Sequence, residues 1–325
     1  MKQYKILTIG GATQDIMFYT DAGRTIRQNQ EELTAFSYGS KVAAKEILYT
    51  FGGGAANTAV SFARLGFETG TLFCLRDDQI GQMIILHLNK EGVDTSLLQY
   101  TDKAYSAFSL VVTPGQSKDH IIFLNRGANL FFKLSTKVLS QIKTDWIYLS
   151  SLVGAGQASN VKTIFGYLKN KPTKLAWNPG VEQLALGQKY FKDLLPKVTV
   201  FIINQEEAEE LVLGCAKIGT PIKDLLIKIK AWGPKYVAIS CGARGAYVYD
   251  GQKIYYHKKL LGTAVNTTGA GDAFGSSLVA GLEHFNGDIN KALRLAMLRS
   301  GNVVRHVGAQ VGLLTDKEVK KYRLW

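Results

Sequence analysis

Short runs rich in Val, Ile and Leu alternate with helix-period stretches along most of this chain. The runs are Lys5–Gly10, Thr71–Leu75, Trp146–Ser150, Lys174–Trp177, Val198–Ile203 and Tyr236–Ser240. The helical patterns fall at Ala55–Leu65, Gln79–Glu91, Glu206–Leu213 and Ala270–Glu283. Buried apolar strands separated by helices are typical of a parallel sheet covered on both faces. The alternation therefore predicts an α/β protein with a mainly parallel central sheet.

Two stretches interrupt this alternation, approximately residues 16–50 and 104–126. The first is polar and turn-rich, with strand-like pieces but no good helical pattern. The second contains two strand-like pieces, Ser106–Val112 and His120–Leu124, on either side of Pro114-Gly115, which favours a hairpin. We expect the two stretches to form a small antiparallel sheet that acts as a lid. Two unrelated surface insertions are the alternative.

The remaining features of the chain favour one domain in a reducing compartment. No repeat, low-complexity tract or Pro- or Ser-rich linker divides the 325 residues, so we expect a single domain, residues 1–325, that includes the lid. The three cysteines, Cys74, Cys215 and Cys241, are odd in number and far apart, as is typical of free thiols. No window approaches the roughly 20 apolar residues of a membrane span. We expect a cytoplasmic protein without membrane contact.

The charge balance is basic, with 39 Lys and Arg against 26 Asp and Glu and a net charge of +13. Such a surplus suits nucleic acid, an anionic membrane or a small anionic ligand. The basic residues are dispersed, with no arginine-rich or aromatic-interleaved tract, which argues against nucleic acid. The five histidines show no His-x-x-x-His pair and the cysteines no Cys-x-x-Cys pair, which disfavours a zinc site.

Glycine-rich segments supply several candidate nucleotide loops. No Gly-x-x-x-x-Gly-Lys-[Ser/Thr] occurs, which excludes a P-loop. Three segments, starting at Gly52, Gly154 and Gly269, nearly match the dinucleotide fingerprint, but each lacks the third glycine that packs helix against strand. A nicotinamide-dependent oxidoreductase is therefore a weak alternative.

The most informative segment is Asn266-Thr267-Thr268-Gly269-Ala270-Gly271-Asp272-Ala273-Phe274-Gly275, which opens into an apolar helical run. The first N–H groups of a helix lack intrahelical partners and the helix dipole adds positive potential, so this turn is expected to bind an anion. A carboxylate at Asp272 would repel phosphate unless it faces a second substrate, whose hydroxyl it orients and deprotonates. We expect Asp272 to be a weak base, because the dipole favours its ionised form.

Asn266–Phe274 resembles the C-terminal signature, (Asp/Asn)-Thr-x-Gly-Ala-Gly-Asp-x-Phe, of the pfkB/ribokinase family of sugar and nucleoside kinases. Further segments resemble the family's other motifs in the same order: Gly11–Asp15, Gly52–Asn57, Arg126–Asn129, Asn204–Glu207, Ser240–Gly245 and Gly308–Gln310. The resemblance covers essentially the whole chain. It implies a ribokinase-like three-layer α/β/α sandwich with a small β lid.

The resemblance also implies transfer of the γ-phosphoryl group of ATP to a hydroxyl of a small sugar or related polyol. Asp272 would be the base, and Gly269, Ala270 and Gly271 would form the anion hole. The acceptor would contact Asp15, Gly53, Gly54, Asn57 and Arg126. The nucleotide would contact Asn204, Ser240, Gly242, Gly245, Thr268, Met297 and Asn302, and Glu207 would hold Mg²⁺ through bound water.

Three positions differ from the family pattern. Gly54 stands where ribokinases carry a Lys, and Ser150 or Ser151 stands where they carry an acidic residue, so both differences count against ribose. Asn266 replaces the Asp that ligates a monovalent cation in many relatives, and a neutral side chain would bind potassium more weakly. An adenosine-type nucleoside kinase and a non-catalytic metabolite-binding relative are the alternatives. The intact Asp272, glycine turn and Glu207 disfavour the latter.

One expectation concerns assembly. The predicted lid carries apolar residues, among them Phe108, Leu110 and Ile122, which would form an exposed face. Exposed apolar faces of this kind usually mark an interaction site. We expect a homodimer in which two lids face each other.

Overall fold

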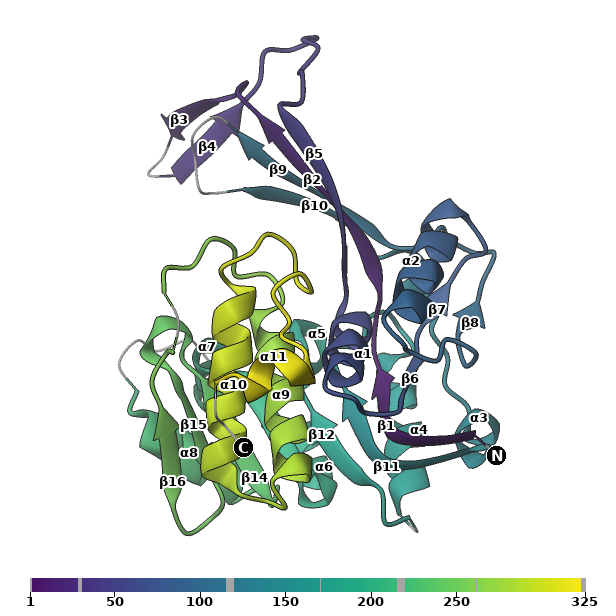
Figure 1. The fold of residues 1–325 in the computed structure, drawn as a ribbon, viewed down its shortest axis with the longest axis vertical. Helices are drawn as coiled ribbons and strands as arrows, with labels where there is room; N and C mark the ends of the chain where they lie inside the picture. Colours follow the sequence, from purple (N-terminus) through teal and green to yellow (C-terminus); the bar gives the residue numbers. More distant parts are fainter. Residues whose placement is uncertain are drawn as a thin grey trace.

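The computed structural model describes residues 2–28, 31–114, 120–169, 171–214, 220–260 and 262–322. An eight-stranded sheet runs through its body in the order β16-β15-β14-β13-β12-β11-β1-β6 (Figure 1). Its strands are β1 (Lys2–Ile9), β6 (Thr69–Leu72), β11 (Ile142–Leu149), β12 (Lys174–Trp177), β13 (Val200–Asn204), β14 (Tyr236–Ser240), β15 (Ala246–Tyr249) and β16 (Ile254–His257). The six from β14 to β6 pair in parallel, which confirms the predicted α/β architecture.

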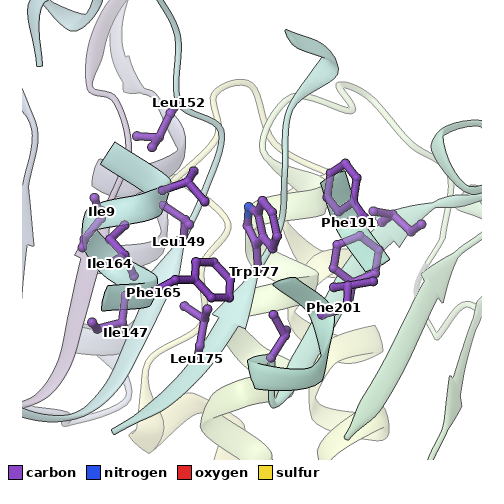
Figure 2. Close-up of a cluster of buried hydrophobic side chains, with 14 of the residues drawn as sticks. Ile9, Ile147, Leu149, Leu152, Ile164, Phe165, Leu175, Trp177, Phe191 and Phe201 are labelled. Carbon is purple, nitrogen blue, oxygen red and sulfur yellow. The ribbon is translucent and has the colours of Figure 1, made fainter. Parts of the chain in front are cut away.

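Helices cover both faces of this sheet. Side chains of one face, such as Ile6, Tyr148 and Ile202, pack against helices α1 (Gly54–Arg64), α9 (Ala270–His284) and α10 (Ile289–Val303). The other face packs against α3 (Thr136–Ser140), α4 (Gln157–Leu168), α5 (Val181–Leu184), α6 (Gly187–Leu194), α7 (Gln205–Leu213) and α8 (Ile222–Lys230). Trp177 lies among Phe165, Phe191 and Phe201 in this second layer (Figure 2). The three-layer sandwich is confirmed.

The run Thr71–Leu75, predicted as one strand, is divided at Phe73. Strand β6 ends at Leu72, and β7 (Cys74–Leu75) pairs with β8 (Gln99–Tyr100) outside the central sheet. Leu72, Phe73, Cys74 and Leu75 are all buried, so the hydrophobic pattern runs on through the break. Helix α2 (Gln79–Lys90) follows directly, capped by Asp78.

The edge strands β15 and β16 were not among the predicted strands. Strand β15 pairs antiparallel with β14, and β16 pairs antiparallel with β15. The short η3 helix (Gly242–Arg244) reverses the chain before β15, which brings the glycines of this loop to the end of β14. Helix α11 (Asp316–Lys320) lies near the end of the described chain.

A second, four-stranded sheet projects from the body near the ends of the parallel strands (Figure 1). Its order is β10-β9-β2-β5, from β2 (Thr13–Thr20), β5 (Glu46–Gly52), β9 (Phe108–Pro114) and β10 (Ile121–Asn125). Both interrupting stretches contribute to it, as expected, but β2 and β9 pair in parallel, so the sheet is mixed. The hairpin β3 (Arg24–Gln28) and β4 (Glu31–Ala35) lies at its far end, while Gly115 and Cys215 lie outside the described residues.

The register corrects one sequence-based grouping. Tyr49, Ile16, Leu110 and Phe123 are direct cross-strand partners, so they share one face of the small sheet. Ile122 pairs with Val111 and therefore lies on the opposite face from Phe108 and Leu110. Successive side chains of a strand point to opposite faces of the sheet, so a one-residue error in the hairpin register moves each side chain to the other face. The sequence does not specify that register.

In the parts of the chain that the structure describes, none of the helices has the length and apolar character needed to span a bilayer.

Candidate active site

The loops that carry the family-like motifs meet at the carboxyl edge of the central sheet. Gly10 follows β1, Ser150 follows β11, Asn204 ends β13 and Ser240 ends β14. Helix α9 begins at the same edge, at Ala270. In open parallel sheets, ligands bind at this edge because the loops converge there. Two cavities lie at this edge, one lined in part by the small sheet and one lined by α10 and the start of α9.

The first cavity, which we call the acceptor cavity, has a volume of about 160 Å³. Three of the predicted acceptor residues line it: Gly53, Gly54 and Arg126. Its other lining residues are Gly10, Gly11, Thr13, Ala107, Leu124, Asn129, Ser151, Leu152 and Val153. Leu124 and Ala107 come from the small-sheet region, so this sheet forms one wall of the cavity.

The two glycines at the start of α1 are required by close contacts. Gly53 has φ +89°, and a Cβ there would come 2.5 Å from Ala12 Cα. A Cβ on Gly54 would come 2.6 Å from the Ser150 hydroxyl. Ser150 is buried and donates a hydrogen bond to the carbonyl oxygen of Ile9. A longer side chain at position 54 would therefore have to displace Ser150, so the two departures from the ribokinase pattern are structurally linked.

Asp15 and Asn57 are buried and do not line the acceptor cavity directly. Asp15 lies on β2, accepts a hydrogen bond from the Ser109 hydroxyl and touches Gly52, where no Cβ would fit. Burial raises the pKa of Asp15, against the lowering effect of Ser109. Asn57 lies on α1 and donates a hydrogen bond from Nδ2 to Oδ2 of Asp272, at 2.8 Å.

Arg126 follows β10 and precedes the η1 helix (Gly127–Phe131). Its guanidinium lies 3.5 Å from the carboxylate of Glu182, and both side chains are well exposed. An exposed pair at this distance is weak, so the cation is available to a ligand in the acceptor cavity. Within the lining of that cavity, Arg126 is the one charged side chain.

Asp272 is the third residue of α9 and is half-buried. Desolvation raises the pKa of Asp272 to about 6, partly offset by the hydrogen bond from Asn57. The helix dipole alone predicts a weaker base. Burial outweighs that effect, because removing a carboxylate from water costs more than a helix N-terminus returns.

The turn Gly269–Gly271 has the geometry of an anion-binding site. Gly269 is the N-cap of α9, with φ +78°, and a Cβ there would come 2.6 Å from Ala309 Cα. The N–H of Ala270 already donates to the carbonyl oxygen of Thr267, at 3.2 Å. Gly271 faces open space and lines the second cavity together with Ala270. The N–H of Gly271 is therefore better placed to meet an anion than that of Ala270.

The second cavity, which we call the nucleotide cavity, has a volume of about 280 Å³. Predicted nucleotide residues on its wall are Ser240, Gly242, Gly245 and Met297, joined by Ala270 and Gly271 of the anion turn. Residues not anticipated are Ala243, Lys259, Ala264, Thr267, Phe274, Ser300, Gly301 and Val304. The mixture of apolar side chains and glycines leaves room for a flat aromatic ring.

Three predicted nucleotide residues lie elsewhere. Asn302 does not line the nucleotide cavity: it is buried, and its amide donates to the carbonyl oxygen of Gly312, because α10 turns this side chain towards the following loop. Thr268 donates its backbone N–H to Oδ1 of Asn266, within the turn itself. Asn204 caps helix α7.

Asn204 and Glu207 form a reciprocal cap at the start of α7. Oδ1 of Asn204 accepts from the N–H of Glu207, and the Glu207 carboxylate accepts from the N–H of Asn204, each at 2.8 Å. Burial raises the pKa of Glu207. No group of three or more His, Cys, Asp or Glu residues that could hold a metal ion occurs within the described ranges. A cation here would therefore need ligand oxygens from a bound phosphate or from water.

Comparisons with known proteins identify the family and the fold of this chain. Residues 13–316 match the model of the pfkB family carbohydrate kinases. The chain is 27% identical over 321 residues to an ATP-dependent 6-phosphofructokinase of Thermoanaerobacterium thermosaccharolyticum, covering 96% of this chain and 91% of that one. The ribokinase of Arabidopsis thaliana, complexed with ribose and ATP, has a similar fold, with a TM-score of 0.78, 19% identity and coverage of 99% and 98%.

A nucleoside kinase of Burkholderia thailandensis, in complex with inosine, also shares the fold, with a TM-score of 0.76, 19% identity and coverage of 98% of both chains. These relatives bind different acceptors, so the fold alone does not define the acceptor. The family match spans nearly the whole chain and includes the nucleotide cavity, the start of α9 and all the residues that line the acceptor cavity except Gly10 and Gly11. This protein belongs to the pfkB family of carbohydrate kinases.

Proposed function

We propose that this kinase transfers the γ-phosphoryl group of ATP to a hydroxyl of a small sugar or sugar derivative, with Asp272 as the base. The observation that carries the proposal is that Asp272, which lines neither cavity itself, lies next to wall residues of both. A Cβ on Gly54, which lines the acceptor cavity, would come 3.6 Å from Asp272 Oδ1. Ala270 and Gly271, which precede Asp272, line the nucleotide cavity.

This position suits phosphoryl transfer, in which catalysis depends on alignment and charge neutralisation. Asp272 would accept the proton of the acceptor hydroxyl while that oxygen attacks the γ-phosphorus. The N–H groups at the start of α9, with Gly271 best placed, would stabilise the charge on the transferred group. A base with a pKa near 6 is largely ionised at neutral pH and yet more basic than an exposed aspartate.

Magnesium would be held largely by the phosphate oxygens and water, since Mg²⁺ keeps much of its hydration shell. Glu207 is the acidic side chain that we propose on its outer side, with Asn204 holding the carboxylate in place. When bound, the ion would neutralise the phosphates. The neutral Asn266 suits a monovalent cation poorly, and we propose no strong potassium dependence.

The acceptor cavity favours a compact polyol over a nucleoside. At about 160 Å³, it is smaller than the nucleotide cavity and lined by glycines, Thr13, Asn129 and Ser151. Arg126 would contact an acidic or phosphate group on the acceptor, if one is present. A nucleoside acceptor remains the second candidate, because a relative of this fold binds inosine.

We also propose that the small sheet acts as the lid and forms a homodimer through its outward face. Tyr49 and Phe123 on this face are 61% and 58% exposed, and they flank Ile16 and Leu110 across the four strands. Leu124, which lines the acceptor cavity, lies on the opposite face. A second copy would cover the outward face without blocking the cavities.

The function is tested by screening neutral sugars, sugar phosphates and nucleosides for thermal stabilisation with a non-hydrolysable ATP analogue, followed by turnover assays with ATP. We expect at least one sugar or sugar phosphate to stabilise the protein and to be phosphorylated. Asp272→Asn should lower turnover by at least about 1,000-fold while ATP-analogue binding stays within about twofold. Turnover near the wild-type rate in this variant would remove Asp272 from the proposed role.

A further inference from the structure

A line of hydrogen-bonded side chains leads from Asp272 away from the two cavities. Asn57 Nδ2 donates to Asp272 Oδ2, and Gln310 Nε2 donates to Asn57 Oδ1, both at 2.8 Å. His87 Nε2 lies 2.6 Å from Gln310 Oε1. The four residues come from α9, α1, the loop after α10 and α2. Neither His87 nor Gln310 lines a cavity of the candidate active site.

The direction of this line is determined by chemistry. Oε1 of Gln310 can only accept a hydrogen bond, so Nε2 of His87 must carry a proton and donate it. The amide nitrogen of Gln310 then points to Asn57 Oδ1, and the amide nitrogen of Asn57 points to the carboxylate. All three donors act in one direction, towards Asp272.

The reverse arrangement is incompatible with an ionised base. If the two amides rotated by 180°, Oδ1 of Asn57 would face the carboxylate of Asp272, and two acceptors would meet unless Asp272 were protonated. Nε2 of Gln310 would then face His87, whose Nε2 would have to be unprotonated. The His87 tautomer with a proton on Nε2 thus selects the arrangement in which Asp272 carries its charge.

The surrounding structure keeps the line in place. Asn57 and Gln310 are each 5% exposed, so water does not readily replace their partners. The ring of His87 stacks on Phe51, with centroids 4.2 Å apart. Arg64 donates to the backbone oxygen of Gln310 at 2.7 Å and is itself paired with Glu91 at the end of α2. His87 on α2 therefore holds the side chain of Gln310, and Arg64 at the end of α1 holds its backbone.

We propose that His87 and Gln310 are positioning residues, which orient the Asn57 amide so that its N–H group holds Asp272 ionised and aligned. The inference rests on the proposed role of Asp272 as base. Among the described residues, Asn57 is the one side chain that donates a hydrogen bond to this carboxylate, so its orientation has a large effect. No other described side chain makes this hydrogen bond to the Asp272 carboxylate.

Other titratable groups face this line and define the background of any titration. Tyr148, fully buried beneath α9, has no hydrogen-bond partner for its hydroxyl and lies close enough to Asp272 for their charges to interact. On the far side, Glu91 interacts with Arg64, His87 and Lys90, and the hydrogen bond from the Arg64 guanidinium is the main cause of the lowered pKa of Glu91. Substitutions that test the line should leave these groups unchanged.

The test measures the ionisation of Asp272 directly, without an acceptor. The full-length protein is labelled with ¹³C at the aspartate side-chain carboxyl, and the Asp272 signal is assigned by its loss in Asp272→Asn. We expect a wild-type midpoint near pH 6. In Gln310→Leu, which leaves Asn57 free to rotate, the midpoint should rise by about one unit, the scale of one hydrogen bond to a charged group.

A pair of variants at His87 separates positioning from packing. His87→Leu removes the donor and should raise the midpoint in the same direction, whereas His87→Gln keeps an amide donor and should return it towards the wild-type value. Gln188→Leu is the matched control, because Gln188 is a half-buried amide on α6 that donates to the carbonyl oxygen of Val212, far from Asp272. Its midpoint should equal that of the wild type.

Turnover provides the second measurement, with fructose 6-phosphate as probe acceptor and ATP as donor. Gln310→Leu and His87→Leu should lower kcat about tenfold with little change in the KM for the acceptor, and His87→Gln should recover most of this loss. An unchanged Asp272 midpoint in both Gln310→Leu and His87→Leu would overturn the inference even if Asp272→Asn abolishes turnover. Normal turnover in Asp272→Asn would instead overturn the proposed function, and the titration would still report whether the line controls Asp272.

Discussion

The start of helix α9 lines the nucleotide cavity and the small sheet lines the acceptor cavity, and the two regions are built in different ways. The α9 turn rests on the central sheet, between α1 and α10, and close contacts leave no room for a Cβ on Gly269. The small sheet projects from the body (Figure 1). It exposes large apolar side chains, such as Tyr49 and Phe123. Rigid parts of a site hold reacting groups in alignment, whereas exposed walls adapt to different ligands.

This contrast indicates that the α9 turn and the small sheet have different roles. Changes at the α9 turn should act mainly on turnover, because that turn meets the group being transferred. Changes in the small sheet should act mainly on acceptor binding and on assembly. The following predictions test this comparison.

Among the substitutions that compare the α9 turn with the small sheet, the largest effect on turnover is expected for Gly269→Ala. The new Cβ would press on Ala309 and strain a residue with φ +78°, which displaces the anion-binding N–H groups. Turnover should fall by about 100-fold or more, the scale of one lost oxyanion donor. Gly166→Ala is the control, since Gly166 lies in α4 with no atom near its Cβ position. Equal turnover in the two variants would contradict a rigid α9 turn.

Arg126→Ala should produce a smaller effect of a different kind. If the acceptor carries a phosphate or carboxylate, KM should rise about tenfold, which corresponds to about 1.4 kcal/mol, while kcat changes little. Lys45→Ala removes an exposed cation that pairs with Asp21 beside the small sheet, outside the acceptor cavity. It should leave KM unchanged. A fall in kcat alone in Arg126→Ala would break the proposed division between the two regions.

Asp272→Asn should also change stability in a pH-dependent way. Because the pKa of Asp272 is raised to about 6, its charged form destabilises the folded state, and that cost is present above pH 6 and disappears as Asp272 is protonated. At pH 8 the variant should therefore melt about 2 °C or more above the wild type, and this advantage should shrink below pH 6.

Asp94→Asn is the opposite control in the same melting experiment. The pKa of Asp94 is lowered to about 2, where hydrogen bonds from Ser96 outweigh desolvation, so its charged form stabilises the fold. This variant should melt below the wild type at pH 8 and approach it as pH falls towards 2. If the two variants shift in the same direction at pH 8, burial does not control the charge of Asp272.

The smallest effect on turnover is expected for Tyr49→Glu, which places a charge on the outward face of the small sheet. Sedimentation at micromolar concentration should show a wild-type dimer and a monomeric variant, with kcat within about twofold of the wild type. Tyr100→Glu changes an equally exposed tyrosine on β8, outside the small sheet, and should remain dimeric. A monomeric wild type would remove the proposed dimer.

Much of the fold was predictable because it depends on local pattern. The strands β12 and β14 agree with the predicted ranges, since each is a short buried run with turns on both sides. The break at Phe73 was not predictable, because burial continues through it. The face of the small sheet on which Ile122 lies was not predictable either, since it depends on the register of β9 and β10.

In the candidate site, too, some features were predictable from the sequence and others were not. Glycines, the Asn-x-x-Glu motif and Asp272 are visible in the sequence, because backbone conformation and helix caps require particular residue types at fixed spacings. The partners of these residues are not visible. Ser300, Gly301 and Val304 replace Asn302 on the wall of the nucleotide cavity, because the direction of a side chain on α10 depends on what packs against it.

By itself, the sequence determined the fold class, the family and the positions of the loops that form the site. These depend on interactions between residues near one another in the chain, or on motifs with specific spacing. Only the tertiary structure decided the basicity of Asp272 and the line Asn57–Gln310–His87 behind it. Desolvation and hydrogen bonding between residues more than 200 positions apart, as for Asn57 and Asp272, depend on how the helices pack, which no local pattern encodes.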